Sequence, residues 1–188
     1  MSYPRWTTAI RVNVLLLAMF LPNAVAQARD IPSPIKSDSS IKLSMLGDTR
    51  VSWMGMTIYE AALWSEDKLF DGSNYTSTVM LSITYRKNIS TKRLLQTTDK
   101  QWRRLGISDS RKREQWLEQL RTIWPDVAPG DVIACVITES GETHFYSRHT
   151  LLGKITDPEF GPGFLAIWLS PESRLPKARR QLLNIEGI

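Results

Sequence analysis

Residues 47–64, GDTRVSWMGMTIYEAALW, set the first expectations for the fold. Arg50 and Tyr59 stand in this run among many large apolar residues, and a buried guanidinium or phenol without a partner costs several kcal/mol. The run therefore predicts one or two strands with a break at Gly55, in which the fold or a ligand supplies partners for Arg50 and Tyr59. Its other large residues are predicted to form core: Val51, Trp53, Met54, Met56, Ile58, Leu63 and Trp64.

Strand patterns surround this stretch on both sides. Alternation of apolar and polar residues, or short apolar runs between turn residues, predicts strands over 41–46, 76–85, 132–138, 143–147 and 150–155. Gly47-Asp48 is predicted to be a turn, and residues 139–142 a tight hairpin loop. The register of 76–85 puts Tyr85 on the core face and Arg86 on the other face.

Helical signals fill the remaining sequence. Ser90 is a good N-cap for a helix ending at Gly106, and a second helix begins near Asp109 or Ser110 and ends before Pro125. A third is predicted to start at Asp157, with an interruption at residues 161–163, and a short one covers 175–183. Strands, a helical pair, then a hairpin and more helices indicate an α+β fold with a mostly antiparallel sheet.

The N-terminus has the plan of a secretory signal peptide. Arg5 and Arg11 carry positive charge, residues 12–21 form a short apolar block, and small residues follow near Ala26 and Ala28. The block is too short for a membrane span, which needs roughly 20 apolar residues. We therefore expect a signal peptide over 1–26, cleavage after Ala26 or Ala28, export to the periplasm, an irregular leader over 27–40 and a domain over 41–188.

Positive charge is concentrated in one region. Cleavage after Ala26 lowers the formal charge from +5 to +3, yet residues 86–125 hold eleven Lys and Arg against four Asp and Glu. In an exported protein this favours anionic lipid head groups over nucleic acid as a partner. A solvated helical face is the simpler explanation of the same charges.

Motifs for common enzyme classes are absent from the sequence. There is no phosphate-binding loop, dinucleotide fingerprint, nucleophile elbow or Cys-x-x-Cys pair. His144 and His149 lack further ligands for a metal, so neither a metal nor a cofactor is predicted. Cys135 is the only cysteine and lies in an apolar strand-like run, which indicates a buried apolar role.

Arg50 and Tyr59 are the remaining candidates for function, and two interpretations stay open. Arg50 can pair with an acid of the domain while the Tyr59 hydroxyl bonds a backbone carbonyl. Alternatively, the guanidinium and the phenol together hold a carboxylate or an enolate of a ligand.

Several stretches, in this order, resemble the chalcone isomerase-like family, in particular its exported bacterial branch. The matching places are TIYEAALW at 57–64 with the arginine before it, LSITYRKNISTKRL at 81–94, Trp102, Pro129-Gly130-Asp131 with the hairpin at Gly141, FLAIWL at 164–169, and Leu182-Leu183. The resemblance implies an open-faced β-sandwich, in which a large antiparallel sheet is covered on one side by helices and a ligand cleft lies between them.

The family also suggests what the site does. Its branches include plant isomerases that close a chalcone to a flavanone, plastid fatty-acid-binding proteins and periplasmic bacterial members. Arg50 resembles the arginine that stabilises the oxyanion in the isomerases, but Ile89 stands where their catalytic tyrosine lies. Tyr59 resembles the tyrosine that fatty-acid-binding members pair with the arginine, and Tyr85 and Arg86 are expected to line or brace the cleft.

Three functional hypotheses follow from these observations. The first is an exported, non-catalytic protein that binds a small amphiphile, such as a fatty acid, through Arg50, Tyr59, Tyr85 and Arg86. The second is an isomerase or intramolecular lyase acting on a chalcone-like substrate. The third is a periplasmic interaction module that docks through its basic helical pair on an anionic membrane surface or a partner protein.

Overall fold

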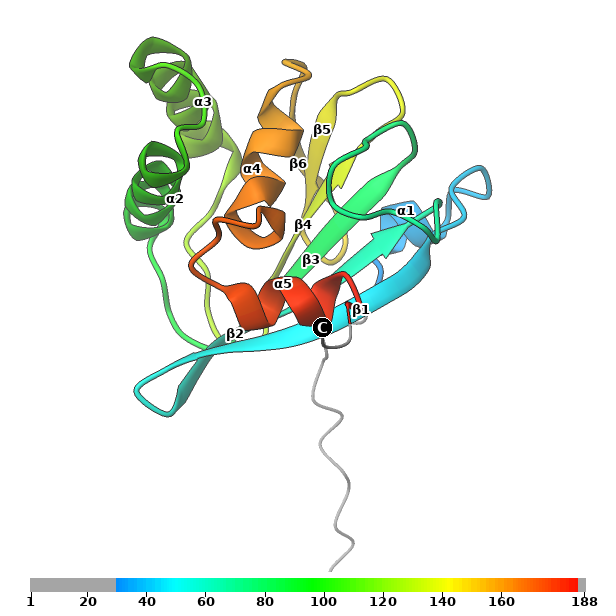
Figure 1. The fold of residues 1–188 in the computed structure, drawn as a ribbon, viewed down its shortest axis with the longest axis horizontal. Helices are drawn as coiled ribbons and strands as arrows, with labels where there is room; N and C mark the ends of the chain where they lie inside the picture. Colours follow the sequence, from blue (N-terminus) through cyan, green and yellow to red (C-terminus); the bar gives the residue numbers. More distant parts are fainter. Residues whose placement is uncertain (1–29, 186–188) are drawn as a thin grey trace, which may run out of the picture.

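A computed structural model describes residues 30–185. Its centre is one six-stranded antiparallel sheet, in which every strand pairs with its neighbour in sequence (Figure 1). The strands are β1 (Ser44–Trp53), β2 (Met56–Ser65), β3 (Val79–Tyr85), β4 (Val132–Ile137), β5 (Thr143–Tyr146) and β6 (Leu151–Ile155). Consecutive antiparallel pairing needs only short connections, apart from the long helical insertion between β3 and β4.

The longer helices cover one face of this sheet (Figure 1). They are α2 (Thr91–Leu105), α3 (Ser110–Ile123), α4 (Phe160–Leu169) and α5 (Pro176–Leu182). Helix α4 lies over the middle of the sheet, α5 over β1 and β2, and α2 and α3 beside α4. This arrangement confirms the predicted α+β fold, with a large antiparallel sheet covered by helices on one side.

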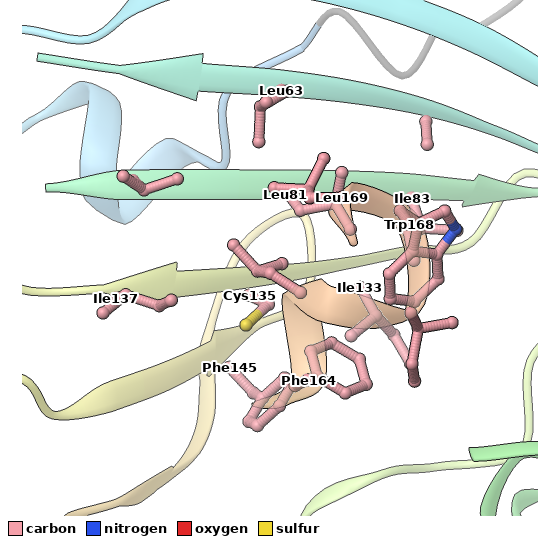
Figure 2. Close-up of a cluster of buried hydrophobic side chains, with 14 of the residues drawn as sticks. Leu63, Leu81, Ile83, Ile133, Cys135, Ile137, Phe145, Phe164, Trp168 and Leu169 are labelled. Atoms are coloured by element: carbon pink, nitrogen blue, oxygen red, sulfur yellow. The ribbon is translucent and has the colours of Figure 1, made fainter. Parts of the chain in front are cut away.

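The core lies between the sheet and α4. Side chains from β2, β3, β4 and β5 point toward Phe164, Trp168 and Leu169 of that helix (Figure 2). Every residue of β3 and β4 is buried, because helices cover one face of these strands and the N-terminal segment covers part of the other. Strand β4, VIACVI, therefore reads as a continuous apolar run, whereas β3 keeps the buried polar residues Ser82 and Thr84 between its apolar ones.

The segment predicted to be an irregular leader is partly helical and is docked on the sheet. It contains α1 (Ser33–Lys36), and Ile35 packs against Met80, Ala134 and Val136 on the face opposite the longer helices. Hydrogen bonds to the β5–β6 loop hold it in place, from Ser33 N to the Arg148 carbonyl at 2.9 Å. The second sheet face is therefore partly covered.

The predicted turn at Gly47-Asp48 is wrong, because β1 runs through it as a strand. Pairing with β2 shifts register between Met45 and Gly47, which marks a β-bulge. A Cβ on Gly47 would lie 2.0 Å from the Gln181 carbonyl oxygen. The glycine thus allows α5 to approach the strand. In the sequence, a glycine needed for such close packing looks the same as a glycine that marks a turn.

The break predicted at Gly55 is confirmed, but three residues around it are exposed. Met54 and Gly55 both have positive φ, 48° and 76°, as a two-residue hairpin turn requires. Trp53, Met54 and Met56 are 66%, 77% and 47% exposed. Their assignment to the core was wrong because the hairpin tip projects past the rest of the sheet (Figure 1).

The helix predictions are mostly confirmed. Ser90 and Asp109 cap α2 and α3 by accepting hydrogen bonds from Arg93 N and Lys112 N, and Gly106 ends α2 in the left-handed conformation. Helix α4 differs from its prediction, since it begins at Phe160 and continues through residues 161–163. The proline there lies in the first turn, where no backbone N–H is needed.

Among residues 30–185, no helix is long and apolar enough to cross a membrane. The predicted signal peptide, residues 1–26, lies outside the described residues.

Candidate ligand-binding cavity

A cavity of about 880 Å³ lies between the sheet and the helices. This volume is within the range of small-molecule sites, roughly 300–1,000 Å³. Residues of β1, β2 and β3 form its sheet side, and residues of α2, α4 and the loops before α2 and α5 form its other walls. The cavity is therefore built where the predicted cleft was expected.

Its inner wall is mainly apolar. Ile83 of β3 and Phe164 and Trp168 of α4 lie on adjoining parts of the core (Figure 2). Trp124, at the end of α3, packs edge-on against Phe145 and tilts against Phe164. Aromatic and branched side chains leave few polar groups to hydrate, so this wall suits an apolar chain.

Two phenols, those of Tyr59 and Tyr85, stand in the sheet wall on paired positions of β2 and β3. Their ring centroids are 6.4 Å apart. The Tyr59 hydroxyl accepts a hydrogen bond of 2.8 Å from Trp168 Nε1, so its own hydrogen is left to donate. Burial raises the pKa of Tyr59 to about 12 and also raises the pKa of Tyr85. Both are neutral donors at neutral pH.

Every charged side chain that lines the cavity is a cation. Lys87 and Arg93 stand before and within the first turn of α2, and Arg174 stands in the loop before α5. All three are exposed, and none has an ion-pair partner among residues 30–185. Because the cations are exposed whereas the aromatic wall is buried, they mark the mouth of the cavity.

Arg50 lies elsewhere, on the opposite face of the sheet. It pairs across the strands with Glu60, and its Nη2 is 2.9 Å from Glu60 Oε1. Arg86 approaches the other oxygen of the same carboxylate at 2.5 Å. Burial disfavours ionised Glu60, but hydrogen bonds and charge from both arginines outweigh it and lower the pKa of this carboxyl.

The structure thus divides the four predicted site residues into two pairs. Tyr59 and Tyr85 line the cavity, whereas Arg50 and Arg86 hold Glu60 on the other face. The cause is strand geometry, because Glu60 follows Tyr59 and successive side chains of a strand point to opposite faces. The expectation that Arg50 and Tyr59 converge on one ligand does not agree with this geometry.

Sequence reasoning missed the three cations at the mouth as a group. Lys87 and Arg93 belong to the basic region 86–125, but composition gave no reason to separate them from its other cations. Arg174 lies about eighty positions further along the chain, so only the tertiary fold brings it to the same cavity. Ile89, at the place of the isomerase tyrosine, lines the wall as an apolar residue.

Other reactive groups lie outside the cavity. Cys135 is buried, and burial raises the pKa of its thiol. His144 contacts Glu142 at 3.0 Å, and the same carboxylate accepts from Lys154. In the described part of the chain, no group of three His, Cys, Asp or Glu residues could hold a metal ion.

Comparisons with known proteins agree with this fold. The crystal structure of a fatty-acid binding protein of Arabidopsis thaliana is similar with a TM-score of 0.58 and 10% identity, over 76% of this chain and 87% of that one. An uncharacterized protein of Haemophilus influenzae is 28% identical over 140 residues, which are 74% of this chain and 67% of the relative. A chalcone isomerase-like family model matches residues 25–184. The chain therefore belongs to the chalcone isomerase-like family.

Proposed function

We propose that this protein binds a small amphiphile with an anionic head group, a fatty acid in the simplest case, in the cavity between sheet and helices. The observation that carries the proposal is the lining itself. An apolar inner wall ends at a mouth with three cations, and no Asp or Glu is among the lining residues. The fatty-acid binding function of the structural relative points to the same class of ligand.

The apolar chain supplies most of the affinity in this proposal. Each methylene transferred from water to the inner wall contributes about 0.8 kcal/mol. Phe164, Trp168 and Ile83 form that wall, and their packing against the core keeps it in place without a ligand (Figure 2). A preformed cavity avoids part of the ordering cost of binding.

The head group is placed at the mouth, near Arg93, Arg174 and Lys87. A carboxylate drawn inside to Tyr59 and Tyr85 would lose its hydration with only neutral donors to replace it, which is costly. At the mouth it keeps water and gains charge-assisted hydrogen bonds from guanidinium groups. The inner phenols serve as neutral donors to any polar group carried along the chain, or to water.

Catalysis of chalcone closure is the less favoured alternative. Arg50, which resembles the oxyanion-stabilising arginine, is not among the lining residues and pairs with Glu60. Ile89 contributes no proton donor at its place in the wall. Loss of the long-wavelength absorbance of chalcone on incubation with the protein would favour this alternative.

Displacement of a fluorescent fatty acid tests the proposal. Replacing Arg93 and Arg174 together by alanine should weaken palmitate binding roughly ten- to hundredfold, the effect of a lost charge-assisted contact. The matched control replaces Lys100 and Arg111, two exposed cations of α2 and α3 away from the cavity, and should bind as the unchanged protein does. Equal affinity of all three proteins, or no binding by any, would contradict the proposal.

Export through the signal peptide is also proposed, and it rests on the three-part pattern of residues 1–26. Expression of the full chain in a bacterium with two membranes tests it. The expected product is found in the periplasmic fraction and begins at Gln27 or Arg29. An intact N-terminus in the cytoplasmic fraction would contradict it.

A further inference from the structure

The tip of the β1–β2 hairpin exposes three large apolar side chains next to one another. Trp53, Met54 and Met56 are 66%, 77% and 47% exposed, at and beside the two-residue turn of Met54 and Gly55. Single exposed apolar residues are common on protein surfaces, but three together on one projecting tip mark an interaction site. The tip lies away from the helices, beyond the ends of the neighbouring strands (Figure 1).

This tip adjoins the mouth of the cavity. Trp53 both lines the cavity and is exposed, and Val51 and Ile58 behind it line the sheet side. The cations Lys87, Arg93 and Arg174 line the same cavity. One cavity lining therefore includes Trp53 of the tip together with three exposed cations and no acid.

The tip is also held in a defined shape. Trp53 pairs directly with Met56, and both turn residues have the positive φ of a tight hairpin. Met54 adopts a left-handed conformation that is uncommon for a residue other than glycine. The exposed side chains are thus presented on a paired hairpin, which has a β-bulge between Val51 and Ser52, rather than on a loose loop.

We propose that the hairpin tip inserts into the interface of an anionic phospholipid bilayer, with Lys87, Arg93 and Arg174 on the head groups. Tryptophan prefers the membrane–water interface, and apolar side chains beside cations are the composition of interfacial membrane-binding surfaces. The surface potential of an anionic bilayer attracts each nearby cation by about 1 kcal/mol. In this orientation the cavity opens toward the bilayer.

An exposed apolar tip could bind several kinds of partner. The positive charge at the mouth of the cavity favours an anionic lipid surface over the others. Three exposed cations in the lining that Trp53 shares, with no acid in that lining, complement a uniformly anionic plane. The basic faces of α2 and α3 are less suited, because none of the exposed large apolar side chains lies on these two helices. Two of their cations are also paired within the protein, since Lys112 bonds Asp157 and Glu159 and Arg113 lies 3.7 Å from Asp99. Those cations already brace the fold.

Docking does not depend on what fills the cavity, so it goes beyond the proposed function. Only the further consequence, exchange of an amphiphile across the mouth while docked, rests on that function. If the protein binds palmitate but not vesicles, only the docking proposal is refuted. If it binds vesicles but not palmitate, only the proposed fatty-acid binding is refuted.

A local probe separates the tip from the rest of the chain. In Met54→Cys, labelled with an environment-sensitive fluorophore, only the introduced thiol reacts, since Cys135 is 2% exposed. The matched control is Leu69→Cys in the β2–β3 loop, where the residue is 89% exposed. Vesicles of phosphatidylglycerol and phosphatidylcholine in equal parts should shift the emission of the tip label to shorter wavelength and leave the Leu69 label unchanged. No shift at either site, or the same shift at both, would overturn the proposal.

Co-sedimentation with the same vesicles measures the strength of docking. Because every variant carries the same N-terminal residues, ratios between variants cancel their contribution. Trp53→Ser with Met54→Ser should lower vesicle partitioning at least about tenfold, and Leu69→Ser should not change it. Equal partitioning of both would contradict insertion of the tip.

Charge reversal at the mouth completes the test. Lys87→Glu with Arg93→Glu should lower partitioning onto phosphatidylglycerol vesicles at least about thirtyfold, because the loss of two surface cations alone has that effect and the two new carboxylates are repelled by the anionic surface. The control Lys100→Glu with Arg111→Glu changes the net charge equally but should act less than about threefold at 0.15 M salt. Equal losses in both double variants would show that net charge alone draws the protein to the vesicle, against the proposed orientation.

Discussion

Tyr59 and Glu60 are neighbours in β2, yet they serve the two faces of the sheet differently. Tyr59 points to the helical side, where it bonds Trp168 and lines a cavity. Glu60 points to the other side, where Arg50 and Arg86 close on it. One step along the strand therefore separates a site that is built around open space from a site in which the polar groups already bond one another.

The difference shows how to judge a polar residue in an apolar run. Arg50 forms an ion pair with Glu60 within the protein, so no ligand is needed to explain its charge. Arg93 and Arg174 have no ion-pair partner among residues 30–185, and both line the cavity at its mouth. A candidate ligand-binding cation is therefore recognised by the absence of a nearby carboxylate and by its place at a cavity. Apolar neighbours in the sequence do not identify it.

The largest effect is expected from truncating the cores on the two faces. Leu81→Ala, on the helical side, should lower the free energy of unfolding by about 3–5 kcal/mol, since the rigid aromatic core cannot move in to fill the void that the shortened side chain leaves. Met80→Ala, on the other side, should cost about 2–3 kcal/mol because the docked segment with α1 can move inward. Urea unfolding of both variants measures the comparison. A larger loss in Met80→Ala would contradict it.

The next effect concerns the ion pairs of the far face. Glu60→Gln should lower the free energy of unfolding by about 1–3 kcal/mol, because Arg86, only 21% exposed, loses the carboxylate charge 2.5 Å from it. Palmitate affinity should be unchanged, since Glu60 does not line the cavity. Weaker palmitate binding at full folding would show that the two faces are coupled.

A smaller effect distinguishes the two phenols of the cavity. Tyr59→Phe removes the acceptor of the Trp168 indole N–H and should cost about 1 kcal/mol in thermal or urea unfolding. Tyr85→Phe keeps the ring and removes a hydroxyl that makes no hydrogen bond to other described residues, so the loss should stay under about 0.5 kcal/mol. Similar losses for both would contradict the assignment of the Tyr59–Trp168 bond.

The smallest effect is in the acid dependence of stability. Because the folded pKa of Glu60 is lowered, its contribution is complete above an ordinary carboxyl pKa near 4.5 and is lost as the pH falls through the folded value. The stability difference between the unchanged protein and Glu60→Gln should thus be constant near neutral pH and shrink below about pH 4.5. Urea unfolding at several pH values measures it. A difference that grows toward acid would reverse the sign assigned here.

Much of the fold was predictable because its signals are local. The caps Ser90 and Asp109, the C-terminal Gly106 and the alternation along β3 depend on nearby backbone and side-chain contacts, and each was confirmed. Gly47 and the glycines of α4 were misread, since their purpose is a close approach to distant residues. A Cβ on Gly161, for example, would lie 2.6 Å from Thr143 Oγ1.

The candidate site was predictable only in part. The strand pattern placed Tyr85 on the helical face, and the family resemblance singled out Tyr59, which lies beside it. The sequence alone determined the element order, the antiparallel sheet and the presence of unusual polar groups in β1 and β2, because period and capping are short-range properties. The tertiary structure decided which of those groups line the cavity. Arg50 and Tyr59 lie on opposite faces of the sheet, whereas Arg174 and Arg93 line the same cavity. Both arrangements are set by strand pairing and helix placement between residues far apart in the chain, which local sequence patterns do not show.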